Sequence, residues 1–152
     1  MMEALVDSIM EKKPEAVDPN MMVTDAAAII AKRSEQRLVV TKDDLVVGIV
    51  TSADMVEKVI AVGANPERVY VRDIMSTPVI TTKMTATIAK AAEIMSDYGV
   101  RKLPVVDDSG VLAGVITSLE LARWLAKQND FRDPALNALA KLKAEGQGGP
   151  YR

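Results

Sequence analysis

Short apolar runs and segments of helical spacing alternate along the chain, separated by polar turns. In the second half, residues 79–81 predict a short strand, and Thr85 is placed to cap the following helix, which Gly99 would end. Residues 103–106 and 111–117 predict two strands joined by a turn at residues 107–110, because Asp, Ser and Gly favour tight turns. A last helix follows, so the order is strand, helix, strand, strand, helix.

The first half shows the same order of elements. A helix is expected at about residues 25–33, followed by strands at 38–40 and 45–50 around a turn at 42–44. A further helix should run to about Val62 and end at Gly63. This agreement between the halves indicates a duplicated α/β (α+β) fold.

The duplication is clearest in one heptad. Residues 48–54 (GIVTSAD) recur 66 residues later as residues 114–120 (GVITSLE), and Ile9-Met10 aligns with Ile74-Met75 at a shift of 65. Repeats of this size would each leave an apolar face exposed, so the two halves should pack on one another. We expect a first repeat at 6–63, a linker at 64–70, a second repeat at 71–127 and a tail at 128–152.

The tail has no counterpart in the repeats. Asp133 followed by Pro134 is typical of a helix start, and Leu136, Leu139 and Leu142 then follow a narrow apolar stripe. A short C-terminal helix is predicted, which would dock on the repeat pair or on another subunit because it is marginal alone.

Each copy of the heptad spans a strand-to-helix turn that can be read in two ways. The unpaired amides at the start of a helix can hold an anion. Alternatively, Thr51 with Asp54, and Thr117 with Glu120, have the spacing of a capping box that serves the helix alone. A glycine inside a strand, at Gly48 and Gly114, often marks a close approach of backbone or ligand, which favours a functional role.

Composition narrows the classes of function. The chain of 152 residues contains no cysteine and no histidine, which removes thiolate chemistry and the commonest metal ligand and general base. No pair of acids stands out at a cleft-like position, so an enzyme is a distant third hypothesis, and no metal or cofactor is expected. Few aromatic residues and a net charge of −2 do not favour nucleic acid, and no membrane span or signal peptide is evident, so the expected location is the cytoplasm.

The repeated pattern resembles the tandem CBS domain pair, here as a free-standing two-CBS-domain protein. The resemblance rests on Ile-Met near the start of each repeat, the LPVVD run at residues 103–107 and the closing Gly-x-x-Thr-x-x-acid motif in both copies. It implies two pseudo-symmetric repeats that pack through their sheets and leave clefts that bind adenosine-containing ligands. It also implies a regulatory sensor that commonly pairs into a homodimer.

The resemblance further implies roles for individual residues. The motif threonine contacts phosphate or ribose, the acid accepts hydrogen bonds from the ribose hydroxyls, and the first strand and the Leu-Pro-Val strand enclose the adenine. From their position, the basic residues at or before the second strand of each repeat, Arg33 among them, could reach a phosphate, although a single charge between helix and strand is more often solvated surface. The expected ligand residues are Thr51, Ser52, Asp54, Arg37, Val79, Thr81, Arg101, Lys102, Pro104, Thr117, Ser118 and Glu120. Because Glu120 is one methylene longer than the family's Asp, we expect the better site at Asp54.

The leading hypothesis is a sensor of an adenine nucleotide, AMP first and then ADP or ATP, that signals to a separate regulated protein. S-adenosylmethionine remains open as a ligand, because it also brings an adenine and a ribose diol. A second class is a structural or interaction protein that has kept the fold without the ligand. The sequence leaves open whether both clefts fill and which protein is regulated.

Overall fold

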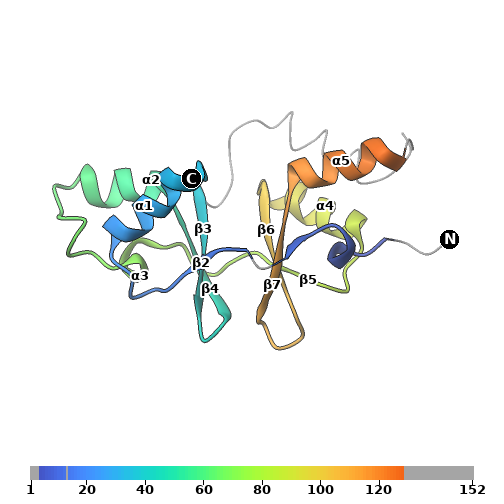
Figure 1. Cartoon of the computed structure of the whole chain (residues 1–152), viewed down its shortest axis with the longest axis horizontal. Coiled ribbons are helices and arrows are strands. Elements are labelled where there is room, and N and C mark those ends of the chain that lie inside the picture. Colours follow the sequence, from blue (N-terminus) through green and yellow to red (C-terminus); the bar gives the residue numbers. More distant parts are fainter. Residues whose placement is uncertain (1–3, 13, 129–152) are drawn as a thin grey trace. The chain divides into compact units, whose positions relative to one another are not determined.

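The computed structural model describes residues 4–12 and 14–128, which fall into two compact units. Of the described residues, the first unit spans Glu15–Val79, and the second combines residues 4–12 and Pro14 with residues 80–128. Each unit holds one sheet and its own helices, which confirms the mixed α/β class and the duplication (Figure 1). The predicted C-terminal helix lies outside the described residues.

The first unit contains a three-stranded sheet of order β2-β3-β4. Its strands are β2 (Ala16–Val17), β3 (Arg37–Lys42) and β4 (Leu45–Thr51). β3 and β4 form the predicted antiparallel hairpin, and β2 pairs with β3 in parallel. At the hairpin turn Asp43 and Asp44 have φ of 51° and 65°, a conformation that Asp tolerates better than most residues.

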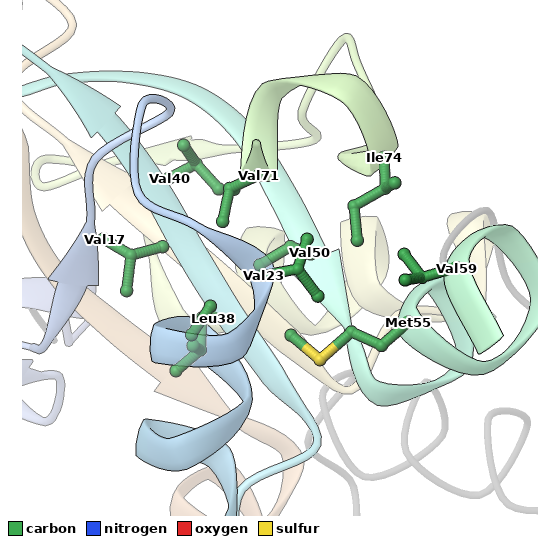
Figure 2. Close-up of a cluster of buried hydrophobic side chains, with 10 residues drawn as sticks. Val17, Val23, Leu38, Val40, Val50, Met55, Val59, Val71 and Ile74 are labelled. Atoms are coloured by element: carbon green, nitrogen blue, oxygen red, sulfur yellow. The ribbon is translucent and has the colours of Figure 1, made fainter. Parts of the chain in front are cut away.

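The helices of the first unit all lie to the same side of β3 and β4 (Figure 1). They are α1 (Val23–Arg33), α2 (Ser52–Met55), its π-helical continuation η2 (Val56–Ile60) and α3 (Val71–Ile74). Figure 2 shows their apolar side chains converging on the sheet, with Val23, Met55 and Val59 among those buried against Leu38 and Val50. The apolar spacing in the sequence therefore marks the face of each helix that covers the sheet.

The second unit contains a four-stranded sheet of order β1-β7-β6-β5, with α4 and α5 to the same side of β6 and β7 (Figure 1). Its elements are a 3₁₀ turn η1 (Val6–Ser8), β1 (Glu11–Lys12), β5 (Thr82–Lys83), α4 (Ile88–Tyr98), β6 (Lys102–Val106), β7 (Leu112–Thr117) and α5 (Ser118–Gln128). Asp107 accepts hydrogen bonds from the N–H groups of Ser109 and Val111, at 2.8 and 3.0 Å, which confirms that it serves the turn.

The opening segment of each sequence repeat belongs to the unit built by the other repeat. In the second unit, β1 pairs with β7 and the Val6 N–H donates to the Ala86 carbonyl. In the first unit, Ser76 exchanges backbone hydrogen bonds with Ile49 at 2.8 and 3.1 Å. Each compact unit therefore contains the first segment of the other sequence repeat, when the repeats are taken as residues 6–63 and 71–127.

Two predicted elements were misplaced. Residues 79–81 are not a strand: β5 is Thr82–Lys83, beside Val105 and Val106, so the partner strand rather than the local β-branched run decides where pairing occurs. The cap of α4 is Thr87, whose hydroxyl accepts from the Lys90 N–H at 3.1 Å, and not Thr85. Gly99 ends this helix with φ of 65°, as predicted.

Candidate ligand site at two strand-to-helix turns

A complete capping box closes the turn between β4 and α2. The Asp54 N–H donates to Thr51 Oγ1 at 3.0 Å, and the Thr51 N–H donates to Asp54 Oδ2 at 2.9 Å. Both side chains are buried. The structural interpretation of this motif is therefore confirmed for the first repeat.

The same box forms between β7 and α5. The Thr117 N–H donates to Glu120 Oε2 at 3.0 Å, and the Glu120 N–H donates to Thr117 Oγ1 at 3.3 Å. Both side chains are half-buried. The longer glutamate therefore reproduces the local hydrogen bonds of Asp54.

The turn amides are mostly satisfied within the protein, which argues against a backbone anion site. Besides the two amides of the first box, the Ser52 N–H donates to the Gln36 carbonyl at 2.9 Å. The equivalent Ser118 N–H donates to the Arg101 carbonyl at 3.1 Å. Because these donors already have acceptors, the main group that each turn offers a ligand is its carboxylate, which accepts hydrogen bonds.

The two carboxylates differ in their surroundings. Lys58 Nζ lies 2.9 Å from Asp54 Oδ1, so both oxygens of Asp54 are engaged by the protein. The same ammonium donates to the Ile74 carbonyl at 2.8 Å. The Asp54 charge is therefore neutralised by a lysine of the adjoining helix.

Glu120 has no such partner among the described residues, where its hydrogen bonds are those of the capping box. Burial raises the pKa of Glu120 above its usual value, and the negative charge of Glu11 raises it further. The hydrogen bond from Thr117 and the positive charges of Arg123 and Lys102 lower this pKa and only partly offset the burial.

A basic residue lies opposite each capping threonine. Arg37 pairs with Thr51 across β3 and β4, and Lys102 pairs with Thr117 across β6 and β7. The two sheets thus bring a cation to equivalent positions beside the two turns. Arg33, by contrast, forms an ion pair with Glu15 in the first unit.

The remaining predicted ligand residues are not members of the two capping boxes. Val79 and Thr81 are half-buried and outside any strand, and Pro104 is buried in β6 opposite Val115. β5 pairs only with the last two residues of β6, so Pro104 lies where β6 has no β5 neighbour, as expected for a proline. A role for these three residues in ligand binding stays a prediction.

The repeated glycines have a structural reason. A Cβ built on Gly48 would lie 2.5 Å from Met75 Sδ, and one on Gly114 would lie 2.6 Å from Met10 Sδ. The close approach is therefore made by the protein's own methionines. It does not count as evidence for a ligand.

Lys58 was missed by the sequence interpretation. Its position four residues after Asp54 on a predicted helix is the spacing of an intrahelical ion pair and could have drawn attention to it. The first box therefore has a third member that its copy lacks.

Among the described residues, no helix is long and apolar enough to cross a membrane. The fold and the paired turns define a duplicated α/β module. Residues 6–61 and 71–127 each match the CBS domain family, and the chain therefore belongs to that family as a tandem pair.

Some of the curated relatives are enzymes, and the region that matches this chain is only a part of their length. The chain is 31% identical over 145 residues to an inosine-5′-monophosphate dehydrogenase of Thermoplasma acidophilum, covering 95% of this chain and 28% of that protein. It is 39% identical over 103 residues to an uncharacterised protein of Methanopyrus kandleri, covering 64% of this chain and 53% of the relative. The chain thus spans about half, or less, of these relatives.

Solved structures share the fold. A CBS domain protein of unknown function from Thermoplasma acidophilum matches with a TM-score of 0.73 and 25% identity over 97% of this chain and 80% of that one. A CBS domain pair solved with 5′-methylthioadenosine and S-adenosyl-L-methionine matches with a TM-score of 0.70 and 29% identity, covering 84% of this chain and 100% of that one. CBSX2 in complex with AMP matches with a TM-score of 0.71, 23% identity and coverage of 84% and 99%, a likeness of fold.

Proposed function

We propose that the chain is a regulatory module of the cytoplasm that binds an adenine nucleotide, AMP first and then ADP or ATP, and transmits its occupancy to another protein. The ribose hydroxyls would donate to the carboxylates of Asp54 and Glu120. Thr51, Ser52, Thr117 and Ser118 would contact ribose or phosphate. A ligand changes the state of such a module only through its different affinities for the two states.

The proposal rests on one observation: a carboxylate that can accept hydrogen bonds and a basic residue lie together at each turn. The capping box fixes a carboxylate at Asp54 and at Glu120, and the neighbouring strand places Arg37 or Lys102 opposite the capping threonine. A ribose diol needs acceptors, and a phosphate needs cationic donors. Both are present twice, in equivalent positions.

The other expected contacts complete the proposed site. Val79, Thr81 and Pro104 would enclose the adenine, and Arg101 would add a cation for the phosphate. These assignments follow the resemblance of the repeats to the CBS pattern.

A second candidate ligand is S-adenosylmethionine. The matched structure that contains it and 5′-methylthioadenosine is 29% identical to this chain. Both compounds carry the adenine and ribose diol that the carboxylates would recognise. The matched structure with AMP is less similar in sequence, at 23% identity.

Thermal unfolding with and without ligand tests the proposal. At a concentration of AMP about 100 times its dissociation constant, the folded protein should gain about 2.7 kcal/mol of stability. Asp54→Ala with Glu120→Ala should abolish this gain for AMP, ADP, ATP and S-adenosylmethionine alike. Thr87→Ala is the matched control, because it removes a helix cap outside the proposed site and should keep the gain.

If none of the four compounds at millimolar concentration shifts the melting temperature, the sensing proposal is wrong. The complete capping boxes then support the second class, a structural or interaction protein. In that case the double variant would lower stability without any ligand effect.

We also propose that the module forms a homodimer. Large apolar side chains are exposed at Val56, Ile60 and Val62 on and just after η2, between 58% and 67%. Exposed apolar groups clustered along one short segment suit a protein interface.

A further inference from the structure

Lys58 neutralises the carboxylate that is proposed to hold the ribose. The Asp54 side chain is 8% exposed and the Lys58 side chain 44%, so the acid is fixed and the lysine reaches it from the surface. Asp54 Oδ2 holds the Thr51 N–H, which leaves Oδ1 for the ribose, and Oδ1 is where the ammonium lies. A ribose hydroxyl that binds Oδ1 must therefore compete with Lys58.

The helix around Lys58 departs from α-helical geometry. η2 is a π-helix, and the Ala61 N–H donates to the Val56 carbonyl at 2.8 Å, five residues earlier. π-helical turns are rare and frequently lie at functional sites. In this geometry the ammonium also donates to the carbonyl of Ile74, the last residue of α3.

The second repeat shows that the lysine is not needed for the fold of the turn. With the shift of 66, Trp124 takes the place of Lys58, and α5 is α-helical throughout. The capping box of Thr117 and Glu120 nevertheless forms. The lysine is therefore an addition specific to the Asp54 turn.

We propose that Lys58 makes the Asp54 site selective for anionic adenine nucleotides over neutral or cationic adenosyl compounds. This inference rests on the proposed function. When a ribose diol replaces the ammonium on Oδ1, the buried carboxylate loses its counter-ion, which is costly unless the charge is compensated. The half-exposed lysine can turn to the ligand's phosphate while remaining near Asp54, so with a nucleotide the displaced ammonium gains a new anionic partner.

Adenosine gives the lysine no such partner, and in S-adenosylmethionine the only anionic group is the carboxylate at the far end of the methionine chain, beyond the sulfonium. Adenosine carries no charge, and the sulfonium of S-adenosylmethionine is positive and repels the displaced ammonium. Neither compound therefore brings an anion next to the ribose to replace the lost ion pair. The lysine thereby distinguishes ligands that share the same adenine and ribose.

Titration calorimetry in a Glu120→Ala background isolates the Asp54 site. AMP, adenosine and S-adenosylmethionine are titrated into this protein and into versions that also carry Lys58→Met or Lys90→Met. Lys90 is the matched control, because it forms an exposed ion pair with Glu93 at 3.5 Å in the second unit. Thermal unfolding verifies that each variant is folded.

The expected result is a change in the ratio of affinities. AMP should bind about tenfold more tightly than adenosine. Lys58→Met should lower the affinity for AMP by about tenfold, which corresponds to one charge-assisted hydrogen bond, and should not lower the affinity for adenosine. Lys90→Met should leave the ratio unchanged. The affinity for AMP should fall more steeply with rising salt concentration where Lys58 is present than in Lys58→Met.

An unchanged ratio of AMP to adenosine affinity in Lys58→Met overturns the selectivity of Lys58 while leaving the proposed function intact. If none of the compounds binds even the protein without substitutions, the proposed function fails and this inference fails with it. If they bind that protein but not the Glu120→Ala background, the Asp54 turn is not a site and the inference is again wrong.

Discussion

The sulfur of Met75 packs directly against Gly48: a Cβ atom built on this glycine would lie 2.5 Å from Met75 Sδ. Met10 lies over Gly114 in the same way, and the two methionines are equivalent in the repeat. The glycine and the methionine of each pair come from different sequence repeats, and each pair lies within one compact unit. The duplicated glycine is therefore explained by the exchange of opening segments.

Adding a methyl group should be more costly at Gly114 than at Gly48. At Gly114 the new Cβ would also lie 2.7 Å from the backbone carbonyl oxygen of Glu11, which cannot yield as a side chain can. Overpacking of this kind costs about 1–3 kcal/mol. We expect Gly114→Ala to reach the upper end of that range and Gly48→Ala the lower end, measured by urea unfolding. Equal costs would show that the contact with β1 is not rigid.

Thr87 rather than Thr85 should stabilise α4. The Thr87 hydroxyl accepts from the Lys90 N–H, and losing an N-cap costs about 0.5–2 kcal/mol. Thr87→Ala should therefore lower the free energy of unfolding by about 1 kcal/mol. Thr85→Ala, two residues away and exposed, is the matched control and should stay within about 0.5 kcal/mol of the original protein.

Much of the fold could be predicted because its signals are local and occur twice. The hairpins follow from apolar runs around Asp-rich turns, and the motif from Thr51 to Asp54 follows from the spacing of a capping box. The exchange of opening segments could not be predicted in this way. The pairing of Glu11 with Val115 joins residues far apart in the chain. An alignment of the two repeats leaves each segment with the repeat in which it stands in the sequence, so the alignment does not reveal the exchange.

The site was predicted less completely than the fold. Sequence spacing identified both carboxylates, but not how many of their oxygens are already engaged. The contact of Lys58 with the Ile74 carbonyl depends on the tertiary packing of η2 and α3. The spacing of apolar residues in the sequence does not predict this packing. The expected preference for Asp54 over Glu120 was based on side-chain length, whereas the larger difference is the lysine.

A charge on η2 should disrupt the proposed homodimer. Val56 and Ile60 are exposed and four residues apart. Val56→Lys with Ile60→Lys should convert a dimer to a monomer in size-exclusion chromatography with light scattering, because an apolar contact would have to bury two charges. Glu57→Lys changes the charge on the same segment while keeping the apolar residues, so it serves as the control. A dimer that persists in the double variant would place the interface elsewhere.

Replacing Glu120 with glutamine should change how stability depends on pH. Because burial raises the pKa of Glu120 in the folded state, the folded protein binds its proton more tightly than the unfolded chain does. The corresponding stabilisation is fully present below the unfolded pKa and is lost as pH rises through the raised folded pKa. Glutamine can accept the same hydrogen bond from Thr117 without carrying a charge.

Glu120→Gln should therefore gain stability relative to the original protein as pH rises from acidic to neutral. The gain should stay below about 1 kcal/mol, because solvent screens a half-buried carboxylate. Urea unfolding at pH 4 and pH 7.5 measures this difference, and Glu93→Gln, an exposed glutamate on α4, is the control that should show no comparable change. A relative loss of stability with rising pH would mean that the Thr117 amide and the nearby cations outweigh burial.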